Sequence, residues 1–167
     1  MALNAYLKLK GQKQGEIKGS VTQKGREGKI MVIAVSHSIV SPRDSASGLP
    51  TGKRMHKPFV ITKELDKSSP LLYNVLTNNE NIKKWVLNFW TPQIKAAQGT
   101  GTEVQHYTVD LLNANIASIH FRMLNNKNPD LMKYAEFEEV SFTYQKITWT
   151  WKDGGITADD DWEAPRA

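Results

Sequence analysis

The chain has 167 residues, no cysteine and a formal net charge of +5. This length suffices for one domain with a buried core, and the absence of cysteine excludes disulfides, thiolate metal sites and cysteine nucleophiles. The longest apolar run, residues 30–35, is too short to cross a bilayer, so we expect no stable membrane insertion. Residues 1–10 lack a basic region followed by an apolar segment, which predicts a cytoplasmic protein without a cleavable signal peptide.

Basic residues are concentrated in the first part of the chain. Residues 1–63 contain 12 Lys and Arg against 3 Asp and Glu, whereas residues 64–167 contain 10 against 14. Such a split is compatible with nucleic-acid binding. It is equally compatible with self-association, in which the basic face of one copy meets the acidic face of the next, and with a solvated surface that has no function.

The first predicted element is a half-buried strand at residues 2–10, where Ala5, Leu7 and Leu9 alternate with polar residues. Residues 11–28 are polar, lysine-rich and glycine-rich. They therefore predict a loop, with a short paired piece at Glu16 and Ile17.

A second strand is predicted at residues 29–40. Its first half is apolar on both faces and should lie between two layers, and its second half becomes small and polar at Ser36 and Ser38. Residues 41–57 follow with two prolines, two glycines and four basic residues, and with almost nothing apolar to bury. The segment predicts either a flexible hairpin or an arm that projects toward a partner, and the strands on both sides favour the arm.

The spacing of apolar residues changes from that of a strand to that of a helix near the centre of the chain. Residues 59–64 alternate as a strand does, and a helix is expected at about residues 69–78, the only strong helix signal in the chain. Ser69 suits the N-cap and Pro70 the first helical position. Apolar residues then recur at helical spacing, at Leu71, Leu72, Val75 and Leu76.

Three further strands are predicted at residues 82–91, 103–112 and 116–123, with turns at 92–102 and 113–115. The residues expected to face inward are Trp85, Leu87 and Phe89 in the first strand, Tyr107, Val109 and Leu111 in the second, and Ala117, Ile119 and Phe121 in the third.

Residues 134–151 form the longest extended segment, and its apolar side changes face twice. Two changes in one segment predict a bulge or a move from one sheet to another, as at the corner of a barrel or a sandwich. Beyond about residue 156 the acidic composition predicts a loose tail. We therefore expect a single, mainly β domain over residues 1–167.

No catalytic or cofactor site is evident. His37, His56, His106 and His120 lie on different predicted elements without metal-ligand spacing, and there is no GxSxG motif. Residues 159–161 are acidic but lack the glycine and distal glutamate of an EF-hand loop. The sequence predicts a protein that is not an enzyme and needs no cofactor.

Two binding functions remain open on the residues alone. A basic barrel could bind nucleic acid, in which case its affinity should fall steeply with salt. A sandwich could bind carbohydrate through Trp149 and Trp151, in which case one of those indoles should be exposed to solvent. Two tryptophans on one strand face are more often packed in a core.

The stretch FVITKELDKSSPLL at residues 59–72 resembles the signature of the Hcp family, the haemolysin-coregulated tube proteins of bacterial type VI secretion. Three other stretches are similar to the family: AYLKLKG at residues 5–11, IMVIAVSHS at 30–38, and FEEVSFTYQKITWTW at 137–151. The resemblance covers nearly the whole chain in the same order.

The resemblance implies two antiparallel sheets closed into a β-barrel, with one helix packed alongside. It implies a homohexameric ring with an open lumen and rings that stack into a tube. The implied partners are further copies of the chain, a spike protein at the tube tip, a contractile sheath and effector proteins in the lumen, with no nucleic acid. The protein would be secreted by this system without a signal peptide, and Trp149 and Trp151 would be largely buried.

The resemblance also assigns surfaces. Residues 41–57 take the place of the family's extended loop toward the adjacent ring, and this loop is more basic than the glycine-rich version of many members. The contact residues would be Ser41, Pro42, Arg43, Asp44, Lys53, Arg54 and Lys57. Ser36 and Ser38 would line the lumen. We expect the basic loop to meet acids on the next ring, and the candidates are Glu136, Glu138 and Glu139.

Overall fold

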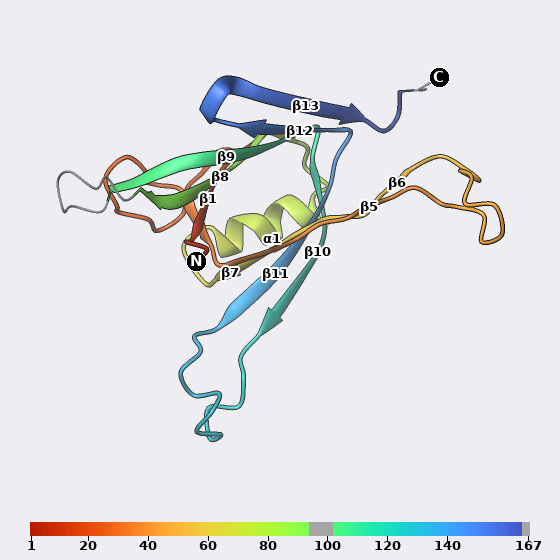
Figure 1. Cartoon of the computed structure of the whole chain (residues 1–167). Helices are drawn as coiled ribbons and strands as arrows, with labels where there is room; N and C mark the ends of the chain where they lie inside the picture. Colours follow the sequence, from red (N-terminus) through yellow and green to blue (C-terminus); the bar gives the residue numbers. More distant parts are fainter. Residues whose placement is uncertain (94–101, 165–167) are drawn as a thin grey trace.

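The computed structural model describes residues 1–93 and 102–164 and shows two antiparallel sheets packed around a shared apolar core (Figure 1). Helix α1 (Ser69–Thr77) contributes Leu72 and Val75 to that core. The expectation of a mainly β fold with one short helix at about residues 69–78 is confirmed.

The first sheet has seven strands in the order β13-β12-β9-β8-β1-β2, and β3 also pairs with β1. Their bounds are β1 (Ala5–Gly11), β2 (Gly15–Ile17), β3 (Ile30–Val32), β8 (Ile82–Gln93), β9 (Thr102–Leu112), β12 (Lys146–Trp151) and β13 (Ile156–Asp161). The short 3-10 helix η1 (Asp153–Gly155) connects β12 to β13. The expected turn at 92–102 has its centre at residues 94–101, which lie outside the described part of the chain.

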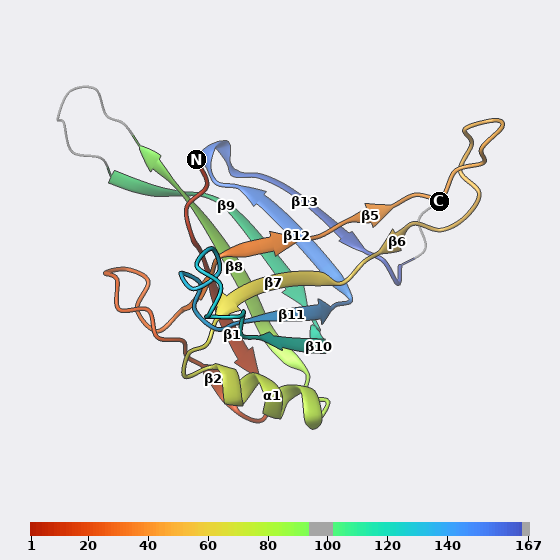
Figure 2. The same ribbon diagram turned by 90° about the horizontal axis from the view of Figure 1, so that it is seen from below.

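The second sheet has the order β10-β11-β7-β4. Its strands are β4 (Ala34–Ser36), β7 (Phe59–Glu64), β10 (Asn115–Arg122) and β11 (Phe137–Thr143). A separate ribbon pairs β5 (Ile39–Val40) with β6 (Met55–His56) and extends away from both sheets (Figures 1 and 2).

The chain passes between the two large sheets four times, at β3–β4, β7–β8, β9–β10 and β11–β12. Residues 134–151 contribute β11 to the second sheet and β12 to the first, so the move between sheets that the two changes of face predicted is confirmed. The predicted strand at 29–40 is divided into β3, β4 and β5. The strand pairings leave separate sheets, and their closure into a barrel stays a prediction.

The division of residues 29–40 corrects one expectation. Ile30 and Val32 are buried in the core, but Ile33, Ala34 and Val35 are exposed in the single chain instead of lying between two layers. The physical reason is the crossing itself. The Ile33 N–H already bonds the Thr62 carbonyl oxygen of the second sheet at 2.9 Å, so the strand leaves the first sheet there.

The core follows the predicted alternation in β1, β8 and β9. Ala5, Leu7 and Leu9 are buried. Trp85 is also buried and packs edge to face against two rings, with centroid distances of 5.0 Å to Phe59 and 5.4 Å to Phe142. Aromatic pairs of this geometry contribute about 0.5–1.5 kcal/mol each beyond the area that they bury. The remaining expected core residues of β8 and β9 are also buried or packed against the core: Leu87, Phe89, Tyr107, Val109 and Leu111.

Two expectations for the later strands are wrong. In β10, Ile119 packs against the core as expected, but Ile116 is buried while Ala117 and Phe121 are exposed. A register shift between Ile116 and Ser118 puts Ile116 on the same side as Ile119. The acidic tail is not loose over residues 156–161, because β13 pairs with all six residues of β12. In the described part of the chain, we find no helix with the length and apolarity that a membrane span requires.

Candidate assembly surface

The arm, defined as residues 41–57, is an ordered ribbon. Beyond the β5–β6 pairing, Arg43 and Pro50 form a bridge, and the Thr51 N–H donates to the Pro42 carbonyl at 3.0 Å. At the tip, the Asp44 carboxylate accepts from the Ser47 N–H and hydroxyl at 2.7 Å each, and these bonds lower the pKa of Asp44. The arm therefore holds its own shape without a partner.

The basic residues of the arm divide into two groups. Arg43, Lys53 and Lys57 are exposed. Arg54 instead turns back toward its own chain, where its guanidinium binds both carboxylate oxygens of Asp160 and donates to the Asp161 carbonyl at 2.9 Å. Arg54 therefore fixes the base of the arm and is not free to bind another ring.

A cluster of polar side chains surrounds this attachment; we call it the anchor cluster, comprising His37, Arg54, His56, Tyr144 and Asp160. The Tyr144 hydroxyl lies 2.7 Å from His37 Nε2 and 2.8 Å from His56 Nδ1. The other nitrogen of His56, Nε2, lies 2.8 Å from Asp160 Oδ2. Burial and the charge of Asp160 raise the pKa of Tyr144, whereas burial and the neighbouring His56 lower the pKa of His37.

Sequence reasoning missed the anchor cluster. It placed His37 and His56 on separate elements, which is correct, but no spacing in the chain shows that Tyr144 brings their rings together. Trp162 also stacks on His56 at 6.0 Å between ring centres. Within residues 1–93 and 102–164, no three His, Asp or Glu side chains are placed to hold a metal ion.

The candidate lumen residues lie next to the base of the arm. Ser36 ends β4, the edge strand of the second sheet, and Ser38 precedes β5. Both are exposed in the single chain. They are available to a lumen or to a neighbouring subunit.

The three candidate acids differ in exposure. Glu136 is exposed and Glu139 half-buried, but Glu138 has no exposed surface, and its carboxylate lies 2.7 Å from Lys63 Nζ. The expectation that Glu138 belongs to the acidic counter-surface is therefore wrong. Its place could have been found from the sequence, since Glu138 shares its strand face with the apolar residues Val140 and Phe142.

Glu138 belongs to a buried network with polar residues of the 59–72 stretch. Lys63 Nζ contacts Ser69 Oγ at 3.0 Å and Asp66 Oδ1 at 3.1 Å. The Ser69 hydroxyl donates to Glu138 at 2.8 Å and accepts from the Asp66 N–H at 3.1 Å. The expectation that Ser69 caps α1 is wrong: Ser68 occupies the N-cap without a side-chain cap bond.

Arg26 orders the loop at residues 11–28. Its guanidinium lies 3.7 Å from the centre of the Trp90 ring and 4.8 Å from that of Tyr6, and it pairs with Glu103 at 2.5 Å. The short pairing expected at Glu16 and Ile17 is confirmed, because both residues lie in β2 and pair with β1.

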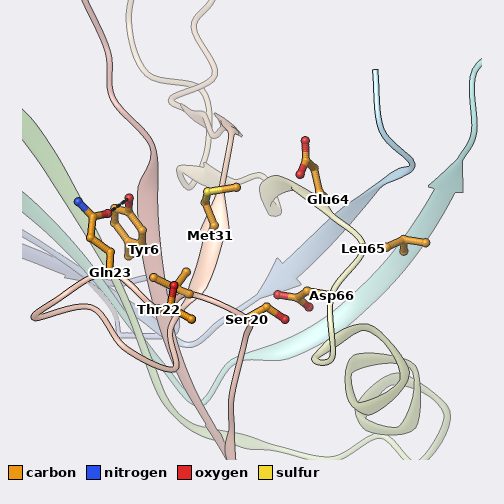
Figure 3. A pocket seen from close by; sticks show the side chains of 9 residues that line it. Tyr6, Ser20, Thr22, Gln23, Met31, Glu64, Leu65 and Asp66 are labelled. Carbon is orange, nitrogen blue, oxygen red and sulfur yellow. Dashed lines mark hydrogen bonds between the residues drawn. The ribbon is translucent and has the colours of Figure 1, made fainter. Parts of the chain in front are cut away.

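A pocket of about 310 Å³ opens beside this loop. Figure 3 shows Thr22 and Gln23 on one side of it and Glu64, Leu65 and Asp66 on another. The loop and the arm extend from opposite sides of the molecule (Figures 1 and 2). The pocket and the arm therefore belong to different ends of the subunit.

The tryptophans of β12 correct a further expectation. Trp149 packs against the core, but Trp151 is 46% exposed and meets His106 edge to face at 5.6 Å. The expectation that both indoles are largely buried is wrong for Trp151 in the single chain. One exposed indole is what the carbohydrate-binding alternative required, so in the single chain Trp151 agrees with that alternative and not with the expectation from the tube interpretation.

Comparison with known proteins separates the two interpretations. Residues 6–151 match the family model described as "Type VI secretion system effector, Hcp". The "Major exported protein" of Pseudomonas aeruginosa strain PAO1 is 39% identical over 176 residues, which cover 100% of this chain and 99% of the relative.

Solved structures agree. A crystal structure of an Hcp protein superposes with a TM-score of 0.85 at 32% identity over 96% of this chain and 99% of that one. For a tryptophan double mutant of Hcp1 from E. coli EAEC 042, the TM-score is 0.78 at 37% identity with the same coverage. For Hcp3 from P. aeruginosa, the TM-score is 0.75 at 32% identity, and the match covers 98% of this chain and 100% of that one. Because the family model, the full-length relative and the fold coincide, the chain belongs to the Hcp family of type VI secretion proteins.

Proposed function

We propose that this chain forms homohexameric rings with an open lumen and that the arm joins each ring to the next. By its family the chain is a structural tube protein of type VI secretion and not an enzyme, and its relatives give no support to nucleic-acid binding. The observation that carries the proposal is the arm, an ordered basic ribbon that projects from the body of the subunit (Figure 1).

The position of the arm suits head-to-tail stacking. A stack of identical rings needs heterologous contacts, in which one surface of a subunit meets a different surface of the next. Arg43, Lys53 and Lys57 are exposed on the arm, which points away from the loop and pocket on the opposite side. The contact set proposed from the sequence therefore stands without Arg54, whose guanidinium binds Asp160.

Glu136 and Glu139 are the proposed counter-surface. Both lie near the junction of β7 and β11, and the exposed Glu64 pairs in register with Phe137 beside them. Opposite charges across such a contact favour the correct register and are screened by salt. We expect stacking, more than ring closure, to weaken as the salt concentration rises.

Ser36 and Ser38 are the proposed lumen residues. Small hydroxyl side chains offer hydrogen bonds without a large apolar surface, which suits a channel that holds effector proteins and releases them. We further propose that the two sheets act as a barrel, that a spike protein and a contractile sheath engage the tube, and that it leaves the cytoplasm without a signal peptide.

Light scattering behind a sizing column, followed by negative-stain imaging, tests the proposal. A hexamer mass with ring-shaped particles is the expected result, and a monomer that forms no rings when concentrated would overturn it. For stacking, we expect Arg43→Glu with Lys53→Glu to leave rings intact and to shorten stacks. The matched control is Lys10→Glu with Lys83→Glu, which reverses two exposed lysines on the first sheet. Stacks of unchanged length in the arm variant would refute the role of the arm.

A further inference from the structure

We propose that the anchor cluster is a proton-sensitive attachment: it holds the arm in one orientation at neutral pH and releases the arm when His37 and His56 are both protonated. The cluster lies within one chain, so the inference does not depend on ring formation. It would give a tube protein of this kind a means of changing its arm with the pH of its surroundings.

The anchor cluster joins four segments of the chain. His56 lies on β6 of the arm, His37 between β4 and β5, Tyr144 between β11 and β12, and Asp160 on β13. The His56 side chain is 2% exposed and that of Asp160 is 10% exposed. Charges and unmade hydrogen bonds at such a site carry a larger energy than they would in water.

The neutral cluster permits one consistent direction of hydrogen bonding. A carboxylate only accepts, so His56 Nε2 carries the proton that it shares with Asp160. Nδ1 of the neutral ring then accepts from the Tyr144 hydroxyl. The Tyr144 oxygen in turn accepts from Nε2–H of His37. Every donor and acceptor in this chain of hydrogen bonds then has a partner.

One added proton can be accommodated. If His56 becomes an imidazolium, its Nδ1–H donates to Tyr144, and the Tyr144 hydroxyl turns to donate to Nε2 of His37 in the other tautomer. Asp160 then faces two cations, because Arg54 already binds the same carboxylate. The cluster keeps all of its hydrogen bonds but carries one net positive charge.

A second proton cannot be accommodated. Both imidazolium rings would donate to the Tyr144 oxygen, so the hydroxyl proton of Tyr144 would lose its acceptor. Three cations would then share the single carboxylate of Asp160, and the next acid along β13, Asp161, binds Arg54 through its backbone carbonyl. Within the described residues, the charged and titratable groups that face the two rings include Arg54, Tyr144, Asp160 and Asp161.

The arm should be held more firmly at neutral pH than in acid. Burial and the nearby His56 lower the pKa of His37 in the anchored state, so a free arm binds this proton more readily. Anchoring is therefore complete above the ordinary histidine pKa of about 6.5 and weakens as the pH falls below it. The protection of the arm amides from hydrogen exchange should fall by about tenfold for each pH unit below this value, as long as the free arm binds one proton more than the anchored arm.

Hydrogen exchange of the arm amides, corrected for intrinsic rates and compared between about pH 7.5 and pH 5, tests this inference. We expect protection of the arm in the wild type at the higher pH and its loss at the lower pH. His37→Gln keeps a donor for Tyr144 but cannot take up the second proton, so protection should persist in acid. His120→Gln removes an exposed histidine of β10 and should behave as the wild type does.

Tyr144→Phe removes the shared hydroxyl and should reduce arm protection at both pH values. If that variant fails to fold, His37→Gln still decides the matter. Equal protection of the wild-type arm at both pH values would overturn the inference, as would the same acid sensitivity in His37→Gln. Neither result bears on whether rings form, which the particle mass reports separately.

Discussion

The network around Lys63 and the anchor cluster around Tyr144 both join distant segments, but they differ in burial and in chemistry. Lys63 and Glu138 have no exposed surface, and no histidine takes part in their network. The anchor cluster lies at the base of the arm and contains two histidines. The comparison indicates that the first network holds the fold together, whereas the second controls one projecting part.

The largest effect should come from Lys63→Met, which leaves the Glu138 carboxylate buried without its cation. We expect a loss of about 3–5 kcal/mol in the free energy of unfolding, measured with urea. Lys63→Met with Glu138→Leu should recover part of that loss, because no uncompensated charge remains. Lys67→Met, at an exposed neighbour, is the control, and an equally small change at Lys63 would contradict the role of the network.

A smaller effect is expected from Asp160→Asn. The carboxylate accepts hydrogen bonds from Arg54 and His56, and bonds to charged groups contribute about 1.5–3 kcal/mol. Urea unfolding should show a loss in this range, and limited trypsin digestion should cut the arm faster than in the wild type. Unchanged digestion would show that Asp160 does not hold the arm.

The pH dependence of stability should separate the two networks further. Because the pKa of His37 is lowered in the folded chain, the unfolded chain binds that proton first, and stability should fall below about pH 6.5 by at most about 1.4 kcal/mol per pH unit. The raised pKa of Tyr144 has the opposite sense and should reduce stability above about pH 10. Urea titrations of wild type and His37→Gln should differ only on the acid side.

The smallest effect should come from Asp159→Asn, next to Asp160 on β13. Asp159 pairs with Lys146 at 3.1 Å, and the two side chains are 48% and 35% exposed. Exposed pairs contribute about 0–1 kcal/mol. A loss in urea unfolding as large as that of Asp160→Asn would remove the distinction between an anchoring aspartate and a surface one.

Several parts of the fold could be predicted from the spacing of apolar residues within one element. The alternation of β1, β8 and β9 and the helical spacing of Leu72 and Val75 each report burial on one side of a single element. The same rule identifies Lys63 and Glu138 as interior residues, because each shares a strand face with buried apolar neighbours. Their charge argued against burial, however, because charged side chains are rarely buried unless they are paired.

Other parts depended on residues far away in the chain. The acidic segment of β13 is a strand because β12 pairs along it and because Asp160 finds Arg54, and neither partner is visible in the segment itself. Residues 29–40 read as one strand, yet they cross between sheets at Ile33, where Thr62 supplies a bond.

The residue pattern alone was sufficient to predict the mainly β class and the helix, to favour a projecting arm over a flexible hairpin and, through the stretch at residues 59–72, to indicate the family. These depend on periodicity and on short motifs, which act over a few residues. Which charged residues are exposed and which are already paired became clear only from the folded chain: Arg54 and Glu138 are bound within it, while Arg43 and Lys53 are exposed. The physical reason is that an ion pair is a contact between two places, and folding alone brings those places together.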